Sequence, residues 1–483
     1  MSARAAMRDD VAMAPPLRPT VYERRAAAPE VVDHALAESR LGVFWLEDAP
    51  AFGSGPLSAP VRADLTVVGG GYLGLWTAVL AKRRNPGARV VLLEAESVGW
   101  AASGRNGGFC EASLTHGEAN GRSRWPEEYD VLERLGEENL NAMESDLQEL
   151  GVDCHWERPG MLSIAVEAHQ LAWLGTDAEV LSADEARQHV NSPIVLGATW
   201  DRGSTALVHP ARLARGLARA AAELGVEIFE HSPVVSVDTP RAGPAVVVTP
   251  RATVTTDRVA LATNVFPSLL RRARLLTVPV YDYVLMTEPL SREQLTSIGW
   301  AHRQGLGDLA NQFHYARLTR DDRILYGGYD AIYHAGRRVR ATYEDRPESH
   351  RRLASHFFTT FPQLEGLRFT HRWAGAIDTC TQFAAFHGLA RRGRVAYSAG
   401  FTGLGVGATR FAAEVLLDRL SGLDTERTML AMVRRKPLPF PPEPMAAAGI
   451  NLARWSLDRA DHRQGERNLV LRALDAAGLG FDS

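Results

Sequence analysis

The stretch that decides the fold is Leu65-Thr66-Val67-Val68-Gly69-Gly70-Gly71-Tyr72-Leu73-Gly74. Its first four residues predict a short buried strand, and the glycines that follow predict a sharp turn. Residues 72–84 carry apolar side chains at helical spacing, and Asn85-Pro86-Gly87 ends that helix. Residues 89–93 then predict a second strand. Strand, turn, helix and strand together indicate a βαβ unit of about thirty residues.

The glycines of this unit follow the GxGxxG pattern. Gly69 allows the tight turn, Gly71 lets the backbone approach a pyrophosphate, and Gly74 lets the helix pack closely against the strand. Glu94 stands twenty residues after Gly74, at the end of the second strand. Its carboxylate can accept hydrogen bonds from both hydroxyls of a ribose and would repel a 2′-phosphate. The complete unit therefore predicts a dinucleotide site, and the alternative is a plain glycine-rich turn.

Composition narrows the class of protein. With 483 residues, 45% hydrophobic and 23% charged, the chain is expected to fold as two interleaved soluble domains. A net charge of −3, from 54 basic and 57 acidic residues, argues against nucleic acid or an anionic membrane as partner. Cys110, Cys154 and Cys380 show no metal or disulfide spacing, which fits a reducing cytosol and no metal. The two lysines are Lys82 and Lys436.

The N-terminal residues 1–25 lack an apolar segment, so no signal peptide is expected, and no apolar run approaches the length of a membrane span. Residues 1–60 are predicted to be an extension and linker. Residues 61–150, 200–265 and 371–430 are predicted to form the cofactor domain. Residues 151–199 and 266–370 would form a substrate domain of mixed α+β structure, followed by a C-terminal tail at 431–483.

Several stretches resemble the D-amino-acid oxidase/glycine oxidase superfamily of FAD-dependent oxidoreductases. They are Val67-Val68-Gly69-Gly70-Gly71-Tyr72, Leu93-Glu94-Ala95, Ala102-Ser103-Gly104-Arg105-Asn106-Gly107-Gly108, Arg317-Leu318-Thr319, Leu325-Tyr326-Gly327-Gly328, Phe361-Pro362-Gln363-Leu364, Trp373-Ala374-Gly375 and Gly400-Phe401-Thr402-Gly403-Leu404-Gly405-Val406. The resemblance implies an α/β plus α+β fold: a Rossmann-type FAD-binding domain with an interleaved mixed-sheet substrate domain. The run Asp378-Thr379-Cys380-Thr381-Gln382-Phe383 departs from the family pattern.

The resemblance also implies a set of FAD contacts. The residues expected around the cofactor are Gly69, Gly71, Tyr72, Leu73, Gly74, Glu94, Ala95, Ser103, Gly104, Arg105, Asn106, Gly107, Gly108, Val235, Gly375, Gly400, Phe401, Thr402, Gly403, Leu404, Gly405 and Val406. Val235 is expected near the adenine, and Gly375 with the 400–406 loop near the isoalloxazine. Because Gly375 stands where related enzymes form a thioether, the FAD is expected to be non-covalent. A helix beginning near Gly407 would direct its N-terminus toward negative charge on reduced flavin.

Aromatic residues in the predicted substrate domain are candidates for substrate binding. Tyr281, Tyr283, Phe313 and Tyr315 would share one strand face and hold an amine by cation–π contact, and the alternative is ordinary core packing. Arg317 is a candidate clamp for a substrate carboxylate.

The resemblance implies oxidation of a small primary or secondary amine, or an amino acid. The substrate would lose a hydride to flavin N5, the imine would hydrolyse, and O2 or another acceptor would reoxidise the flavin. Related sarcosine oxidases place a lysine over the flavin. The lysine shortage here predicts either slow reaction with oxygen or another cation, such as an arginine or the substrate itself, in the lysine's role. The rival functions are an FAD monooxygenase that needs NAD(P)H and an inactive flavin-binding paralogue.

Overall fold

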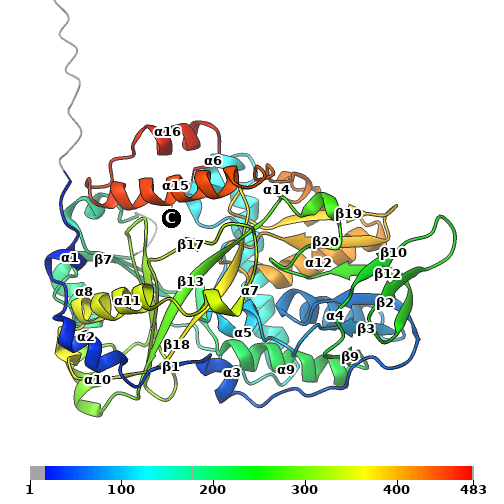
Figure 1. Cartoon of the computed structure of the whole chain (residues 1–483), viewed down its shortest axis with the longest axis horizontal. Coiled ribbons are helices and arrows are strands. Elements are labelled where there is room, and N and C mark those ends of the chain that lie inside the picture. Colours follow the sequence, from blue (N-terminus) through cyan, green and yellow to red (C-terminus); the bar gives the residue numbers. More distant parts are fainter. Residues whose placement is uncertain (1–16, 176–178, 481–483) are drawn as a thin grey trace, which may run out of the picture.

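The computed structural model describes residues 17–175 and 179–480, and these residues form two large sheets and one two-stranded sheet, with helices around them (Figure 1). Residues 1–16 of the predicted extension lie outside the described part. Within residues 17–60 the chain forms α1 (Val21–Arg24), α2 (Pro29–Leu36), β1 (Arg40–Leu41) and α3 (Phe44–Asp48). The predicted fold class is confirmed, since one sheet carries the βαβ unit and the other is a mixed sheet.

The smaller sheet contains the βαβ unit. Its parallel strands are β2 (Val61–Val68), β3 (Val90–Leu93), β9 (Glu227–Phe229), β12 (Thr253–Leu261) and β20 (Val395–Ala399). β10 (Ser236–Asp238), β11 (Ala245–Val248) and β19 (Phe386–Ala390) add antiparallel pairs at its edges. β2 lies between β12 and β3, so the glycine turn that follows it stands near the middle of the sheet.

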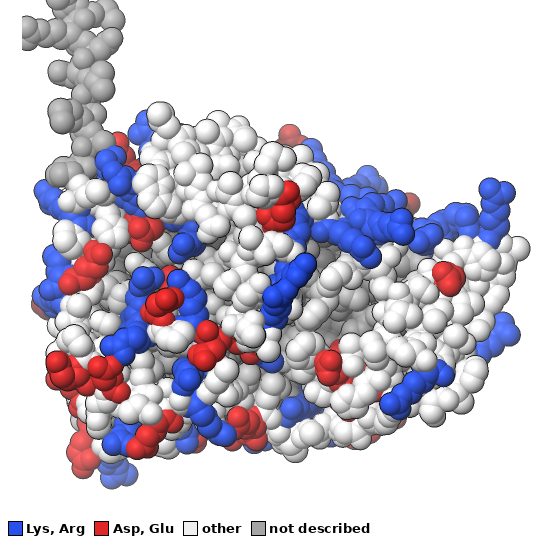
Figure 2. Space-filling model, viewed as in Figure 1, with Lys and Arg blue, Asp and Glu red and all other residues white. Residues whose placement is uncertain are grey.

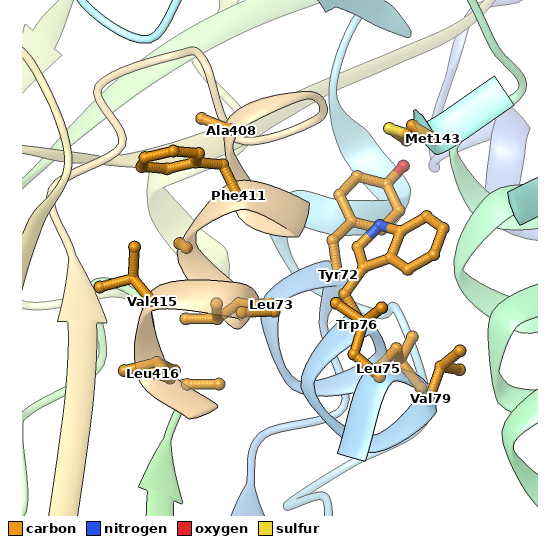
Figure 3. Close-up of a cluster of buried hydrophobic side chains, with 14 of the residues drawn as sticks. Tyr72, Leu73, Leu75, Trp76, Val79, Met143, Ala408, Phe411, Val415 and Leu416 are labelled. Carbon is orange, nitrogen blue, oxygen red and sulfur yellow. The ribbon is translucent and has the colours of Figure 1, made fainter. Parts of the chain in front are cut away.

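Helices pack on this sheet through a continuous apolar core. α4 (Tyr72–Arg84) contacts α9 (Pro210–Glu223) and α12 (Ala408–Ser421), and α12 also contacts α7 (Tyr129–Glu149). Figure 3 shows Leu73 of α4 beside Val415 and Leu416 of α12, with Met143 of α7 near Tyr72. Trp76 is fully buried there. Because α4 is buried on several sides, its N-terminus is held firmly against the glycine turn.

The larger sheet is mixed. Its strand order is β1-β18-β13-β16-β15-β14-β5-β7-β6, with β17 paired to β13. The bounds are β18 (Phe369–Thr379), β13 (Val278–Thr287), β16 (Ile324–Gly328), β15 (His314–Leu318), β14 (Gly305–Asp308), β5 (Met161–Ala165), β7 (Gly197–Asp201), β6 (Glu179–Ser182) and β17 (Ile332–Tyr333). The predicted boundary put residues 371–379 in the cofactor domain, whereas β18 pairs with β1 and β13 in this sheet.

Shorter elements complete the chain. α11 (Pro347–Thr360) contacts β13, β16 and α2, and so covers one face of the larger sheet. β4 (Phe109–Glu111) pairs with β8 (Thr205–Leu207). The other helices are α5 (Ala102–Arg105), α6 (Glu118–Arg124), α8 (Ala183–His189), α10 (Arg292–Ile298), α13 (Glu426–Met429) and α14 (Ala431–Arg434), with short 3-10 helices at η1 (Ala168–Trp173), η2 (Arg271–Ala273), η3 (Ala341–Tyr343) and η4 (Pro362–Leu364).

The C-terminal tail folds back over the molecule. α15 (Met445–Asp461) and α16 (Leu469–Ala476) lie side by side along one edge, coloured red in Figure 1. The carboxylate of Asp461 fixes the end of α15 to the loop between β14 and β15 by accepting hydrogen bonds from Asn311 and Gln312. Among the described helices, none has the length and apolar character needed to cross a bilayer.

Charge is unevenly spread on the surface although the net charge is small. Figure 2 shows basic side chains gathered beside β19 and β20. Arg272 of η2 donates to the carbonyl of Leu389 at 3.2 Å, and Arg392 and Arg394, in the turn before β20, both donate to the carbonyl of Pro240. A whole-chain charge near zero does not predict such a local basic strip. The expectation against nucleic acid therefore stays a prediction.

Candidate active site

The glycine turn has the close contacts that its motif predicts. Gly69 has a φ of +114°, and a Cβ on it would lie 2.4 Å from the carbonyl oxygen of Ala262. A Cβ on Gly74 would lie 1.9 Å from the carbonyl oxygen of Gly69. Both positions therefore require glycine for the backbone itself. Gly71 caps α4 without a side chain, and its missing Cβ leaves space beside Ser103.

Glu94 lies beside this turn at the end of β3. Its carboxylate accepts hydrogen bonds from the backbone N–H of Gly70 at 2.6 Å, from that of Glu96 at 2.9 Å, and from the indole N–H of Trp100 at 2.9 Å. Burial raises the pKa of Glu94 from its ordinary value. The acid of the predicted fingerprint is thus at the glycine turn.

The loop after β3 is fixed by hydrogen bonds of its own. The backbone N–H of Tyr72 donates to the Ser103 hydroxyl at 3.0 Å, which ties this loop to the start of α4. The Asn106 side chain accepts from the backbone N–H of Gly108 at 2.8 Å. Arg317 donates to the carbonyls of Gly108 and Val208 and is buried. Arg317 therefore supports this loop from behind and does not line the cavity.

A cavity of about 740 Å³ begins at the glycine turn and extends between the two sheets. Most of its lining is apolar. The predicted cofactor residues that line it are Gly71, Tyr72, Leu73, Ser103, Arg105, Asn106, Gly107, Gly375, Phe401, Thr402, Gly403, Leu404, Gly405 and Val406. The structure therefore brings together the glycine turn, the 103–107 loop and the 400–406 loop, which are far apart in the sequence.

Other predicted cofactor residues lie behind or beside the cavity. They are Gly69, Gly74, Glu94, Ala95, Gly104, Gly108, Val235 and Gly400. Gly104 and Gly400 are glycines because a Cβ there would meet the Gly99 carbonyl at 2.2 Å or the Cys380 sulfur at 2.8 Å. Val235 is 58% exposed and bonds through its backbone to Val248. Its predicted contact with adenine stays a prediction.

The predicted aromatic wall needs a correction. Phe313 and Tyr315 line the cavity, but Tyr281 and Tyr283 do not. On β13 the cavity face carries Val278, Val280, Asp282 and Val284, so the two tyrosines point to the opposite face. There their hydroxyls donate to the carbonyls of Arg340 and Tyr343. The expectation that all four aromatic residues share one face is wrong. Along β13, Tyr281 and Tyr283 alternate with the residues that line the cavity and therefore lie on the other face.

Carboxylates on the cavity wall were not among the predicted site residues. Asp282 of β13 accepts a hydrogen bond from the Tyr315 hydroxyl, and burial raises the pKa of Asp282 to about 6. Glu111 of β4 also lines the cavity, and burial raises its pKa. No motif contains these residues. An acidic residue in the middle of an otherwise apolar strand was the one available signal.

Asp378 organises the loop that precedes α12. Its carboxylate accepts from the backbone N–H of Gly400 at 2.5 Å and of Phe401 at 3.2 Å. Burial raises the pKa of Asp378 to about 7. α12 begins at Ala408, as predicted, so its N-terminus follows directly on this loop. Asp378 therefore fixes the start of the 400–406 loop.

The tail forms the roof of the cavity, which the sequence did not reveal. Met445, Ala446, Gly449, Ile450, Ala453, Arg454 and Leu457 of α15 line it, together with Leu471 and Leu474 of α16 and the proline-rich segment 438–441. These side chains are mainly apolar and cover part of the cavity. The tail thus belongs to the site.

The site combines a dinucleotide-binding turn with a largely apolar cavity next to it, which is the arrangement of an enzyme that holds a dinucleotide cofactor against a small substrate. The family model for FAD-dependent oxidoreductases of the DAO type matches residues 64–419. The chain belongs to this family, and FAD is its cofactor.

Individual relatives agree with this assignment. The chain is 31% identical over 390 residues to gamma-glutamylputrescine oxidoreductase of Escherichia coli K12, covering 77% of this chain and 86% of the relative. It is 27% identical over 403 residues to a probable oxidoreductase of Haemophilus influenzae, with 77% and 86% covered. The structure of glycine oxidase from Geobacillus kaustophilus superimposes with a TM-score of 0.64 at 21% identity, covering 78% of this chain and 99% of that one, and shows the same fold.

The residues present fit FAD. The missing Cβ at Gly71, the uncapped start of α4 and the carboxylate of Glu94 lie together at the turn, as a diphosphate and a ribose require. The cavity that starts at Gly71 is long enough to pass between the 103–107 and 400–406 loops. Cys380 lines the cavity, but its thiol donates to the carbonyl of Ala384 at 3.2 Å, and burial raises its pKa to about 11.

Proposed function

We propose that this protein oxidises a small primary or secondary amine to an imine, which then hydrolyses. The observation that carries the proposal is the cavity itself, in which apolar walls surround the carboxylates of Asp282 and Glu111. A carboxylate in an apolar cavity attracts a cation, and an amine is a cation at neutral pH. Among the similar proteins, one is named for a putrescine derivative and another for glycine.

An amine without a carboxylate fits this cavity better than a free amino acid. Three arginines line it in the described part of the chain, and each already has an acidic partner. Arg105 pairs with Glu344 at 2.5 Å, Arg467 with Asp475 at 2.6 Å, and Arg454 lies 4.0 Å from Asp330. A substrate carboxylate would have to compete with these acids for its partner. The amine substrate is therefore favoured over the amino acid.

The chain's own residues supply binding, orientation and exclusion of water. FAD, when bound, accepts the hydride from the carbon next to the amine nitrogen. Phe313 and Tyr315 form one side of the cavity, and α15 closes it from above. A desolvated cavity favours the neutral amine, which is the form that can lose hydride.

The test is anaerobic reduction of the flavin by a panel of amines, by matched amino acids and by NADPH, followed by loss of the yellow colour. We expect amines to reduce the flavin and the matched amino acids to do so more slowly. Reduction by NADPH alone would instead support the monooxygenase. A flavin that no compound reduces would support the inactive binding protein.

The electron acceptor is proposed to be something other than oxygen in the main reaction. Lys82 lies on α4, where its ammonium donates to the carbonyls of Pro86 and Ala88 at 2.6 and 3.0 Å. Lys436 is exposed at the start of the proline-rich segment. Neither lysine lines the cavity, so neither is placed to assist the reaction of oxygen.

A further inference from the structure

Asp282 occupies the position where the predicted flavin site meets the substrate space. It pairs across β13 and β18 with Gly375, and residues paired in this way point to the same face of a sheet. Both Asp282 and Gly375 line the cavity. Arg105, from the loop that begins the cofactor site, is the nearest side chain to Gly375. The carboxylate of Asp282 is therefore at the boundary between the cofactor loops and the space beyond them.

Tyr315 is held firmly in the orientation that reaches Asp282. A Cβ on Gly327 would lie 2.6 Å from the Tyr315 ring, and one on Gly107 would lie 2.7 Å from it, so the ring passes between two glycines. Phe109 packs edge-on against it, with ring centroids 5.6 Å apart. The hydroxyl at the end of this ring donates to Asp282. Glycine at positions 107 and 327 thus leaves the space in which the Tyr315 ring reaches the carboxylate.

The surroundings of Asp282 favour an anion that can still gain a proton. Besides the Tyr315 hydroxyl, its stabilising donors are the backbone N–H groups of Tyr283 and Gly328. The titratable or charged groups on the elements around it are His314 and Tyr315 on β15, Tyr329 after β16, Asp378 on β18, Arg105 on α5 and Glu111 on β4. Burial raises the pKa of Tyr315 well above its ordinary value, so its hydroxyl stays a donor.

From this geometry we infer that Asp282 binds the ammonium group of the substrate and accepts its proton, and that Tyr315 positions Asp282 for that role. The inference rests on the proposed amine oxidation. In the transfer, one N–H bond of the ammonium breaks and one O–H bond forms on the Asp282 carboxylate, leaving a neutral amine and a carboxylic acid. No other base is needed. Asp282 touches the substrate, and Tyr315 acts through Asp282.

The first test measures cation binding without any turnover. Tetramethylammonium is a cation that can lose no proton, and tert-butanol is a neutral molecule of similar shape. Their binding is followed by quenching of tryptophan fluorescence in native holoenzyme, in Asp282→Asn and in Tyr281→Phe, whose hydroxyl lies on the opposite face of β13. We expect Asp282→Asn to weaken cation binding about tenfold or more, because a charged contact is lost, and to leave the alcohol unaffected.

The pH dependence of that binding is a second signature. Because an ionised Asp282 is required, the affinity of the native protein for tetramethylammonium should fall as pH drops through about 6. Asp282→Asn should lose this dependence, and Tyr281→Phe should keep it. If native protein binds the cation no better than the alcohol, or if Asp282→Asn binds it as native protein does, the inference is wrong.

The proton transfer is tested by anaerobic stopped-flow reduction with the fastest amine of the panel. In native protein the limiting rate should level off above about pH 7, since Asp282 is then ionised. In Asp282→Asn it should keep rising with pH and approach the native rate only where the free amine becomes abundant. Tyr315→Phe should shift the native inflection without abolishing it. Identical pH profiles in native protein and Asp282→Asn would overturn the proton transfer.

The two proposals fail in different ways. If no amine reduces the native flavin, the proposed function fails, while tetramethylammonium binding still decides whether Asp282 is a cation site. If amines reduce the flavin and Asp282→Asn changes neither binding nor the pH profile, amine oxidation stands and Asp282 has no part in it.

Discussion

Asp461, near the C-terminal end of the chain, accepts two hydrogen bonds from Asn311, one from its backbone N–H at 2.9 Å and one from its side-chain amide at 2.7 Å. Asn311 lies in the cavity wall, and α15, which Asp461 ends, forms the roof. Asp461 therefore joins the tail to the substrate side of the site, across 150 positions of the sequence, and Asp458 adds a hydrogen bond from the Gln312 side chain. The tail residues that line the cavity are thus anchored to its opposite wall.

The first prediction concerns this contact. Replacing Asp461 by Asn removes the negative charge that accepts hydrogen bonds from Asn311 and Gln312. We expect the free energy that holds α15 against this loop to fall by about 2–4 kcal/mol. We expect the amine KM to rise about tenfold with unchanged FAD content, and hydrogen exchange to speed up in residues 445–461. Asp424→Asn, at an exposed position between α12 and α13, is the matched control. Native protection of α15 in Asp461→Asn would refute the prediction.

The second prediction concerns the glycine turn. A side chain at position 71 would extend into the space beside the Ser103 hydroxyl, where even a Cβ would lie 2.9 Å from that oxygen. We expect Gly71→Val to be purified nearly colourless, with a flavin-to-protein absorbance ratio at least about tenfold below native. Gly203→Val, at an exposed site with open space around it, should stay yellow. A fully loaded Gly71→Val protein would contradict the assignment of this turn.

The third prediction is that FAD is released without breaking a bond. The Cys380 thiol is buried and, with a pKa of about 11, is not ionised at neutral pH, so it is a poor nucleophile toward the flavin. Acid precipitation should therefore leave the yellow colour in the supernatant. Cys380→Ser should retain the same amount of FAD. Colour that stays with the precipitated protein would show a covalent link.

The fourth prediction concerns oxygen. Because neither lysine lines the cavity, Lys436→Met should leave the rate of reoxidation by oxygen within about twofold of native. Native protein should also turn over faster with an artificial electron acceptor than with oxygen. The measurement is stopped-flow reoxidation of reduced enzyme at several oxygen concentrations. A selective collapse of oxygen reactivity in Lys436→Met would show that this lysine reaches the flavin after all.

The cofactor half of the site could be predicted from the sequence because its signals are local. One βαβ unit contains the glycines at 69, 71 and 74, the helix at 72–84 and the acid at 94. The glycines are required because the backbone or a cofactor comes too close for a side chain. The loops at 102–108 and 400–406 were placed by resemblance to a family. The structure then brought both loops to the same cavity.

The substrate half could not be predicted in the same way. Apart from Asp282, both faces of β13 carry apolar or aromatic side chains. The sequence of this strand therefore does not indicate whether the face with Tyr281 and Tyr283 or the face with Asp282 lines the cavity. The roof depends on the contact between Asn311 and Asp461, and a contact over that separation leaves no periodic signal in the sequence. These positions are set by tertiary packing, which local patterns do not encode.

The central claim is that amines reduce the flavin of this protein. The most direct measurement is anaerobic titration of the purified yellow holoenzyme with primary and secondary amines, followed by the flavin absorbance in a stopped-flow instrument. At least one amine should bleach the flavin within a single turnover, with a rate that saturates as the amine concentration rises and that increases with pH up to about pH 7. If no amine bleaches the flavin at any pH, while NADPH or a hydroxy acid does, this protein is not an amine oxidase.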